Sequence, residues 1–155
     1  MITTIEERLR KLGIDLPPPA APAANYAPFL ISGSQLFISG QLPMGPNGVE
    51  IQGKLGDVIS IDTGQLAAQL CAINILAQAR AALDGNLNRL RACLRLGVFV
   101  NATSDFTDHP RVANGASDLI AAALAEKGVH TRFAMGAASL PFNAAVEVDA
   151  LFEFA

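Results

Sequence analysis

The strongest constraint on how this chain folds is the alternation of apolar and polar residues at its C-terminal end. From Ala144 to Phe154, the larger apolar residues recur at every second position. Because side chains along a β-strand point alternately to its two faces, this pattern predicts a strand with one apolar and one more polar face. The apolar face carries Val146, Val148, Ala150, Phe152 and Phe154, and the other carries Glu147, Asp149, Leu151 and Glu153.

A second strand is predicted before this one, in the first half of the stretch from Gly128 to Asp149. This second strand contains a single arginine. A turn over Ser139–Asn143 joins the two strands. The arginine, Arg132, is followed by the apolar run Phe133–Gly136. Burying a charge without a partner is costly, so we expect the guanidinium to meet a carboxylate, either of this protein or of a ligand.

The first 24 residues are predicted to form a short helix and a proline-rich connector. Ile2–Lys11 has the pattern of an amphipathic helix, with Thr3 or Thr4 as its cap and Gly13 as its end. Pro17–Pro22 is typical of an extended polyproline segment and is too short to link separate domains. We therefore expect residues 1–24 to lie along a single domain formed by residues 25–155.

The strands before the C-terminal pair are predicted from turn residues and apolar runs. Tyr26–Ser32 and Gln35–Ser39 flank Gly33-Ser34, which is typical of a hairpin with a two-residue turn. Gly45–Gly48 predicts a further turn. Cys93–Val100 is dense in apolar residues, which favours an interior position in the sheet.

Two long helices are predicted between these strands. The first is expected to start at Asp62 with Gln65 completing its cap, and to close at Gly85. The second is expected to have Asp108 as its N-cap and to stop at Gly128. Each carries one apolar stripe at helical spacing. The stripes are Leu66, Leu70, Ile73, Leu76 or Ala77, and Leu83 in the first helix, and Val112, Ala116, Leu119, Ile120, Ala123 and Leu124 in the second.

The order of strand–strand, helix, strand, helix, strand–strand predicts an α/β (α+β) domain built on one β-sheet. Two long helices can cover only one face of such a sheet, so the other face is expected to meet partner subunits. The composition agrees with this, since charged residues are 16% of the chain against a usual ~25%. The mean hydropathy of +0.35 is high for a chain without a membrane span.

Several classes of protein and site are disfavoured by the sequence. No apolar run is long enough to span a membrane, and Met1–Arg8 lacks the features of a signal peptide, so we expect a cytoplasmic protein. A net charge of −3 argues against a nucleic-acid surface. His109 and His130 have no ligands at metal-site spacing. Cys71 and Cys93 are predicted to be buried thiols rather than a disulfide or a metal site.

Five short motifs follow one another along the chain: Tyr26 before the hairpin, Ser39–Pro43, Thr131-Arg132, Leu140-Pro141 and Val146–Val148. In this order and spacing they resemble the signatures of the RidA (YjgF-type) family of reactive-intermediate, or enamine/imine, deaminases. The resemblance covers about residues 25–155. The segment His109–Asp118 and the added N-terminal helix resemble a divergent branch labelled YjgF-like or endoribonuclease L-PSP.

The resemblance implies a chorismate-mutase-like fold with a mixed β-sheet, assembled as a homotrimer with sites in the clefts between subunits. It implies that Arg132 holds the carboxylate of a small substrate and that Glu147 positions the hydrolytic water. A guanidinium–carboxylate pair is strong and oriented, and one carboxylate can suffice to present water to a C=N carbon. No metal or organic cofactor is implied. The residues implied to line the cleft are Tyr26, Ser39, Asn114 and, through its backbone, Ala134.

The chain departs from the family pattern at one point. Typical members have a cysteine where this chain has Ala134, and the bulky Phe133 precedes it. Two alternatives to an imine hydrolase stay open: a non-catalytic small-molecule binder or regulatory trimer, which this departure favours, and an RNA-cleaving or translation-inhibiting protein, which the older label of the family suggests. The second is disfavoured by the acidic charge and the few aromatic residues. Arg132 and Glu147 could also form a purely structural ion pair.

Overall fold

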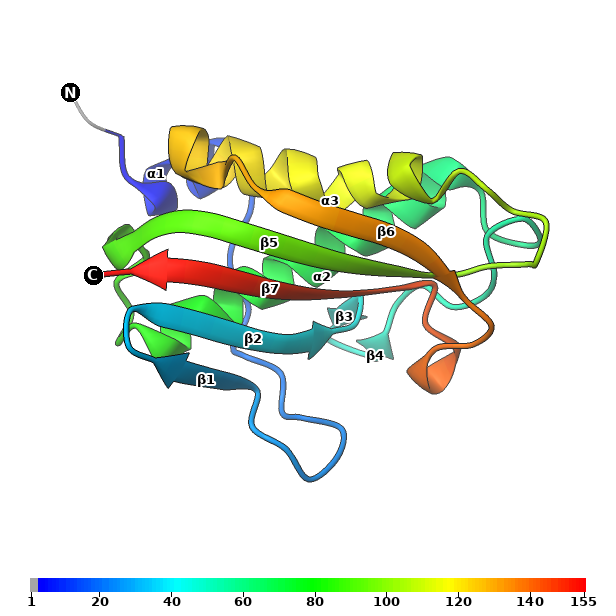
Figure 1. Ribbon diagram of the computed structural model, residues 1–155, viewed down its shortest axis with the longest axis horizontal. Helices are drawn as coiled ribbons and strands as arrows, with labels where there is room; N and C mark the ends of the chain where they lie inside the picture. The colour runs from blue at the N-terminus through cyan, green and yellow to red at the C-terminus, as the bar shows by residue number, and fades with distance from the viewer. Residues whose placement is uncertain (1–2) are drawn as a thin grey trace.

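The centre of the computed structural model, which describes residues 3–155, is a five-stranded mixed β-sheet (Figure 1). Its strands are β1 (Phe29–Ser32), β2 (Gln35–Gln41), β5 (Leu90–Asn101), β6 (Thr131–Ala137) and β7 (Val146–Phe154). They are arranged in the order β1-β2-β7-β5-β6, in which β5 and β6 are parallel and the other neighbours are antiparallel. The predicted α+β class with a mixed sheet is confirmed.

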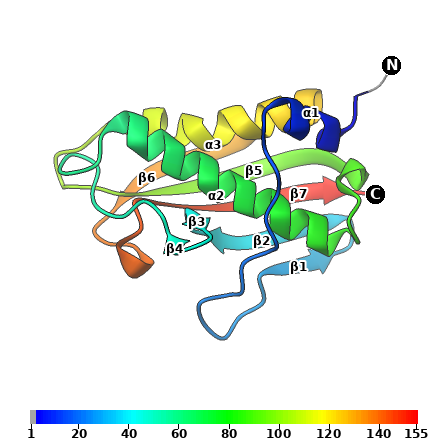
Figure 2. The same ribbon diagram turned by 180° about the vertical axis from the view of Figure 1, so that it is seen from behind.

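Two long helices, α2 (Ile61–Ala82) and α3 (His109–Leu124), cover one face of the sheet, as Figure 2 shows from behind. The short α1 (Ile5–Lys11) packs against α3. Within residues 3–155 no helix covers the opposite face, which is turned to the viewer in Figure 1 and is called the open face below. The remaining short elements are β3 (Met44–Gly45), β4 (Gly48–Val49) and the 3₁₀ turns η1 (Leu87–Arg89), η2 (Ala125–Gly128) and η3 (Pro141–Asn143).

The middle strand, β7, shows the alternation predicted from the sequence. The residues of its predicted apolar face are buried in the core except for Phe154, which is partly buried; on the other face Glu147, Asp149 and Leu151 are partly buried and Glu153 is exposed. Because alternate residues of a strand face opposite ways, these four residues lie on the open face. The buried residues of β7 are Val146, Val148, Ala150 and Phe152.

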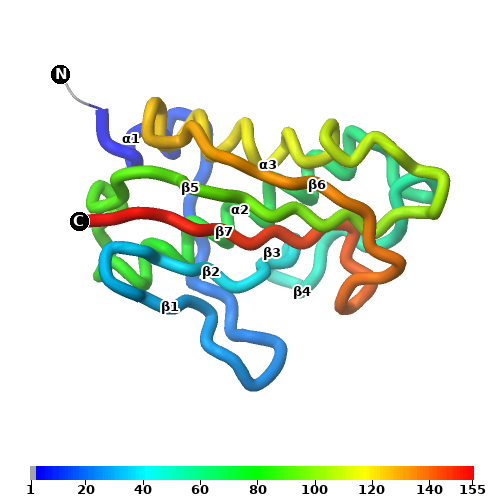
Figure 3. Tube along the Cα trace, in the orientation of Figure 1, coloured from blue at the N-terminus to red at the C-terminus, as the bar shows by residue number. Residues whose placement is uncertain are grey.

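The two strands predicted between Gly128 and Asp149 both form, but they do not pair with each other. β5 lies between β6 and β7, as the trace in Figure 3 shows. Arg132 is in register with Leu96 of β5, and Glu147 is in register with Phe99. The interior position predicted for β5 is confirmed.

The predicted hairpin is formed by β1 and β2. Ser32 pairs with Gln35, and Gly33 in the turn has a φ of +60°, which glycine adopts without steric cost. The turn predicted at Gly45–Gly48 joins β3 to β4.

The prediction for α2 is wrong in two respects. The N-cap is Ser60, whose side chain accepts a hydrogen bond from the Thr63 backbone, so the helix begins before Asp62. The predicted stripe is confirmed only in part: Leu76, Ala77 and Leu83 are buried, whereas Leu66 is exposed and Leu70 and Ile73 are only partly buried. The buried face consists largely of small residues: Gly64, Ala67, Ala68, Cys71, Ala72, Ala77 and Ala79, together with Ile75 and Leu76.

Close packing of α2 on α3 explains this difference. A Cβ on Gly115 of α3 would overlap the carbonyl oxygen of Gln65 in α2. Small side chains allow two helices to approach this closely, whereas leucine side chains would hold them apart. The hydrophobic stripe therefore coincides with the buried face of α2 only in its second half, because small side chains are selected where the helix packs closely.

The other helix predictions are largely confirmed. α3 has Asp108 at its N-cap position and buries the whole predicted stripe, although the helix itself ends at Leu124 and continues to Gly128 as a 3₁₀ turn. α1 has Thr4 as its N-cap, in a capping box with Glu7. Ile2, which was predicted to begin this helix, lies outside the described residues.

Both cysteines are buried free thiols, as predicted. Burial raises the pKa of the Cys93 thiol to about 12 and raises the pKa of Cys71 well above its ordinary value. Neither thiol is therefore suited to act as a nucleophile. None of the helices in residues 3–155 combines the length and the apolar character that crossing a membrane requires.

Candidate functional site

Arg132 lies on the edge strand β6, and its side chain points to the side of the sheet that α3 covers. Its Nη1 donates to Asn114 Oδ1 and to Ser117 Oγ, both at 2.9 Å. Its Nη2 donates to the carbonyl oxygen of Pro110 at 3.1 Å. All three acceptors belong to α3, so this helix fixes the orientation of the guanidinium.

These three acceptors of Arg132 are electrically neutral. Among residues 3–155, no carboxylate forms an ion pair with the guanidinium. Its Nε–H and the second hydrogen of Nη2 have no acceptor in the same residues. The half-buried charge is thus oriented but not neutralised, and two donors remain for a further acceptor.

A hydrogen-bonded relay extends from Arg132 to His130. His130 Nδ1 lies 2.6 Å from the carbonyl oxygen of Gly128, so Nδ1 carries the proton and donates. His130 Nε2, 2.9 Å from Ser117 Oγ, then accepts the serine hydroxyl hydrogen in the neutral form. Ser117 therefore donates to His130 while it accepts from Arg132. Sequence reasoning missed Ser117, although its position one helical turn after Asn114 places both on one face of α3.

Glu147 lies on the open face of the middle strand β7. Gly40 of β2 lies beneath its carboxylate, where any Cβ would overlap Glu147 Oε1. A cavity of about 280 Å³ opens here, lined by Gly40, Phe99, Leu140, Glu147 and Asp149. Partial burial, followed by the negative charge of Asp149, raises the pKa of the Glu147 carboxyl. The site thus holds a carboxylate with increased affinity for a proton.

Asp149 is the second carboxylate in this cavity, and the sequence did not single it out. Its Oδ1 is buried without a hydrogen-bond partner among the described residues, and its Oδ2 lies 3.7 Å from Arg95 Nη2. Gly97 of β5 makes room for it, since a Cβ there would overlap Asp149 Oδ1. Two glycines on the strands either side of β7 therefore accommodate the two carboxylates.

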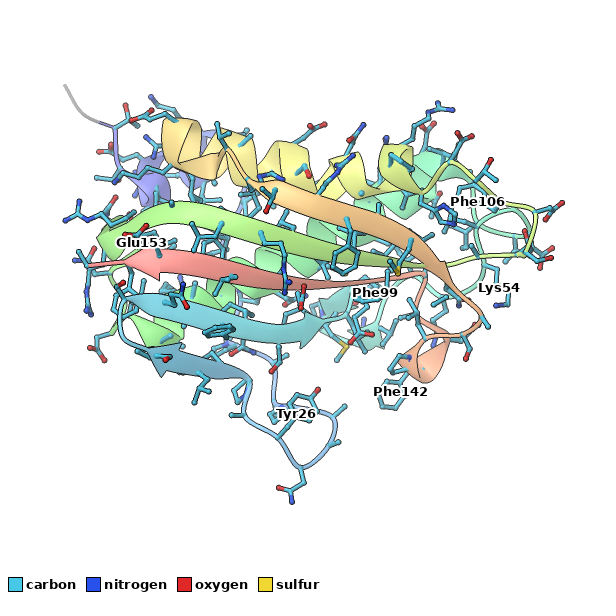
Figure 4. The ribbon with its side chains drawn as sticks, viewed as in Figure 1. Tyr26, Lys54, Phe99, Phe106, Phe142 and Glu153 are labelled. Atoms are coloured by element: carbon cyan, nitrogen blue, oxygen red, sulfur yellow. The ribbon has the colours of Figure 1, made fainter. Side chains whose placement is uncertain are left out.

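Tyr26 and Ser39 both lie close to Gly40, the glycine beneath the Glu147 carboxylate. Tyr26 is exposed in the loop before β1, as Figure 4 shows, and lines a small cavity with Gly40 and Phe142. Ser39 directly precedes Gly40, and its hydroxyl donates to the carbonyl oxygen of Ala27 at 2.7 Å. These two residues therefore belong to the surroundings of Glu147 rather than to those of Arg132.

Ala134 lies two residues beyond Arg132 on β6, so the two share a face. It is partly buried and packs against the hydrophobic core. The candidate residues thus form two groups within one chain. Arg132, Asn114 and Ala134 lie on the helix side of β6, whereas Glu147 lies on the open face and Tyr26 and Ser39 lie close to Gly40, which lines the Glu147 cavity. A single chain does not bring the guanidinium to the Glu147 carboxylate.

Comparison with known proteins gives the family. Residues 6–154 match the family described as "YjgF/chorismate mutase-like, putative endoribonuclease". The chain belongs to this family. The resemblance found in the sequence motifs and the chorismate-mutase-like fold are thereby confirmed.

Three relatives are similar over nearly their whole length. Protein TCP17 of Trypanosoma cruzi is 49% identical over 150 residues, which are 96% of this chain and 93% of that protein. The structure of Atu1372 from Agrobacterium tumefaciens superposes with a TM-score of 0.92 at 48% identity, covering 97% of this chain and 92% of the other. The structure of a Shewanella oneidensis protein, also described as a putative endoribonuclease, superposes with a TM-score of 0.95 at 35% identity, covering 98% of this chain and all of the other.

Proposed function

We propose that this member of the YjgF family hydrolyses 2-imino acids, or their enamine tautomers, to 2-keto acids and ammonia. The observation that carries the proposal is the Arg132 guanidinium, which is oriented by three neutral acceptors and keeps an uncompensated positive charge. A carboxylate-bearing substrate would supply the missing negative charge. The two unused N–H groups of Arg132 offer the donors that such a carboxylate needs.

Glu147 would position and deprotonate the attacking water. A water oxygen adds to the carbon of the N-protonated imine while one water proton passes to the carboxylate, which gives a neutral carbinolamine. The carboxylic acid then returns this proton to the nitrogen, the C–N bond breaks and ammonia leaves, while the hydroxyl proton of the carbinolamine passes to the Glu147 carboxylate as the carbonyl forms. The raised pKa of Glu147 supports this role, because a base is most effective when its pKa approaches the working pH.

The site would be formed between two chains of a homotrimer. In one chain the two groups lie on opposite sides of the sheet, and β5 separates their strands. The open face also has exposed apolar residues, including Phe37 and Met135, which a neighbouring chain would cover. A second chain that presents its β6 edge to this face would bring its Arg132 towards Glu147.

The remaining candidate residues would line this cleft. Asn114 holds Arg132 in place through a hydrogen bond at 2.9 Å. Tyr26 and Ser39 would bound the cleft beside Glu147, and the backbone of Ala134 would face the substrate from β6. No step of the proposed reaction needs a metal or an organic cofactor.

A second candidate is a non-catalytic binder of small carboxylates in the same cleft. The ring of Phe133 favours it, because this ring packs edge-on against Phe99 with centroids 5.3 Å apart. Phe99 lines the Glu147 cavity, so Phe133 supports one wall of this cavity through its contact with Phe99. A bulky aromatic wall would restrict the substrates that reach Glu147, or hold a ligand without turnover.

The deciding experiment measures the loss of 2-imino acids that an amino-acid oxidase generates in situ. The wild-type protein should accelerate their hydrolysis above the spontaneous rate, and Arg132→Ala should abolish the acceleration. Arg91→Ala is the matched control, since Arg91 is an exposed arginine of β5. If no imino acid is hydrolysed faster but Arg132-dependent binding of carboxylates persists, the protein is a binder.

A further inference from the structure

A second cavity, of about 570 Å³, opens where the parallel strands β5 and β6 end. Lys54 and Phe106, two of its lining residues, lie at the same end of the molecule in Figure 4. Neither Arg132 nor Glu147 lines it. The lining residues are Lys54, Ala102, Thr103, Ser104, Phe106, His109, Gly136, Ala137 and Ala138, and we call this the Lys54 cavity.

The ammonium group of Lys54 is fixed in place without a counter-charge. Its Nζ donates to Asn101 Oδ1 at 2.8 Å and to the carbonyl oxygen of Ala138. Asn101 is fully buried, so the ammonium is held at a defined point. Throughout residues 3–155 no carboxylate pairs with it. A partly desolvated cation with only neutral partners is costly, and an anion beside its third N–H would offset that cost.

His109 brings a second group of suitable chemistry to the Lys54 cavity. Its ring packs edge-on against Phe106, with centroids 5.3 Å apart, and lies over Gly136. A Cβ at Gly136 would come within 2.7 Å of His109 Nε2, so the glycine makes room for the ring. Neither ring nitrogen has a hydrogen-bond partner among the described residues, and a protonated imidazole donates from both.

The N-terminal end of α3 lies beside the Lys54 cavity, since His109 lines this cavity. His109 is the first residue of this 16-residue helix, and the side chain of the N-cap, Asp108, makes no capping hydrogen bond. The partial positive charge of a helix N-terminus favours anions. The Asp108 carboxylate lies 3.7 Å from Arg111 instead, and it is not part of the cavity wall.

Hydroxyl groups complete the polar part of the wall. Thr103 Oγ1 donates to Asp105 Oδ1 at 2.8 Å, so this hydroxyl is already engaged. The Ser104 hydroxyl has no partner in the part of the chain that the structure describes, and it can donate to a ligand. The Asp105 carboxylate lies outside the cavity wall.

We propose that the Lys54 cavity binds the phosphate group of a small phosphorylated molecule. A fixed ammonium, an imidazole and a free hydroxyl line one space beside the start of α3, and each can donate a hydrogen bond to a multiply charged oxyanion. The volume exceeds that of phosphate alone, and the apolar walls of Ala102, Phe106 and Ala137 fit the carbon part of an ester. The inference is independent of the deaminase proposal, because it uses neither Arg132 nor Glu147.

The test is a titration of the ¹⁵N-labelled protein with inorganic phosphate and with methyl phosphate, at constant ionic strength, followed by NMR. Saturable amide shifts are expected at residues 102–110 and 136–138. Lys54→Gln should weaken binding by about tenfold or more, since hydrogen bonds to charged groups are the stronger kind. His109→Ala should also weaken it, and it decides the question alone if Lys54→Gln does not fold. Lys11→Gln, an exposed lysine on α1, is the control and should bind as wild type does.

Three results would overturn the proposal. Shifts that spread over the surface without saturating would show that phosphate acts only as an electrolyte. Unchanged affinity in both Lys54→Gln and His109→Ala would exclude the Lys54 cavity as the site. Acetate that binds as tightly as phosphate, or methyl phosphate that binds far more weakly than inorganic phosphate, would exclude a phosphate ester as the ligand.

Discussion

The surroundings of Arg132 and of Glu147 differ in how each holds its charge. Arg132 makes three hydrogen bonds to α3, all to neutral oxygens. Glu147 makes no hydrogen bond to the described residues and lies over a glycine beside a second carboxylate. The first arrangement fixes the orientation of the Arg132 guanidinium and keeps its positive charge. The second disfavours the negative charge of Glu147 and leaves the carboxylate free to accept a proton. The first suits holding a substrate, and the second suits proton transfer.

The largest expected effect separates these two roles kinetically. Glu147→Gln should lower kcat by on the order of 10²- to 10⁴-fold with little change in KM, because a general base acts only in the transition state. Glu153→Gln is the control on the same face of the strand and should leave both constants unchanged. A comparable loss of kcat in Glu153→Gln would mean that total charge, rather than the Glu147 position, matters.

Glu147→Gln should also keep or raise the thermal stability at neutral pH. The folded-state pKa of Glu147 is raised, chiefly by burial, so the folded protein holds this proton more tightly than the unfolded chain does. The stability that this bound proton contributes is therefore lost as the pH rises from the unfolded-state pKa through the raised folded-state pKa, and an uncharged glutamine avoids that loss. Calorimetry at neutral pH checks the sign, and a marked fall in Tm would contradict it.

The next effect concerns the space that Gly40 leaves for Glu147. Gly40→Ala should displace the carboxylate and lower kcat by on the order of 10²-fold, the effect expected of a misplaced catalytic group. Gly45→Ala is a matched control, because its Cβ would instead displace the carboxylate of Glu50, an exposed residue outside the site. Circular dichroism should show both variants folded, and equal activities would contradict the role of Gly40.

A smaller effect is expected from the relay behind Arg132. Ser117→Ala removes one of the three acceptors of Arg132 and should raise KM by about tenfold or less while kcat stays near wild type. Ser34→Ala, in the exposed hairpin turn, is the control. A change confined to kcat would mean that Ser117 takes part in the chemistry rather than in holding the guanidinium.

The smallest effect is a displacement of the pH profile. If ionised Glu147 is the base, activity falls as the pH drops through its raised pKa. The charge of Asp149 is the second cause of that shift, so Asp149→Asn should move the acid limb of kcat to lower pH. Glu153→Gln should leave the limb in place, and an acid limb that moves to higher pH in Asp149→Asn would contradict the assignment.

Local patterns predicted much of this fold because they depend on residues that are near in sequence. The alternation along β7, the turn at Gly33 and the stripe of α3 all follow from side-chain periodicity or backbone preference. The stripe of α2 was confirmed only at Leu76, Ala77 and Leu83, because close contact with α3 selects small residues and hydrophobicity alone ranks leucine above alanine. Periodicity identifies the contact face of a helix only when size does not decide the packing.

The candidate site was predictable only in part, for a related reason. Arg132 and Asn114 were found from motifs, but Ser117, Asp149 and the role of Gly40 depend on neighbours from other elements. The separation of Arg132 from Glu147 depends on β5 lying between β6 and β7, and no local pattern encodes this strand order.

The most direct test of the central claim is complementation between two inactive variants. Arg132→Ala and Glu147→Gln should each lack activity alone, because every cleft then misses one partner. After unfolding and refolding together in equal amounts, each mixed trimer should regain activity at about one of its three clefts, where an intact Arg132 meets an intact Glu147; this is about one quarter of all clefts in the mixture. If the mixture stays inactive although mixed trimers are detected by native mass spectrometry, the two residues do not form a shared site between chains.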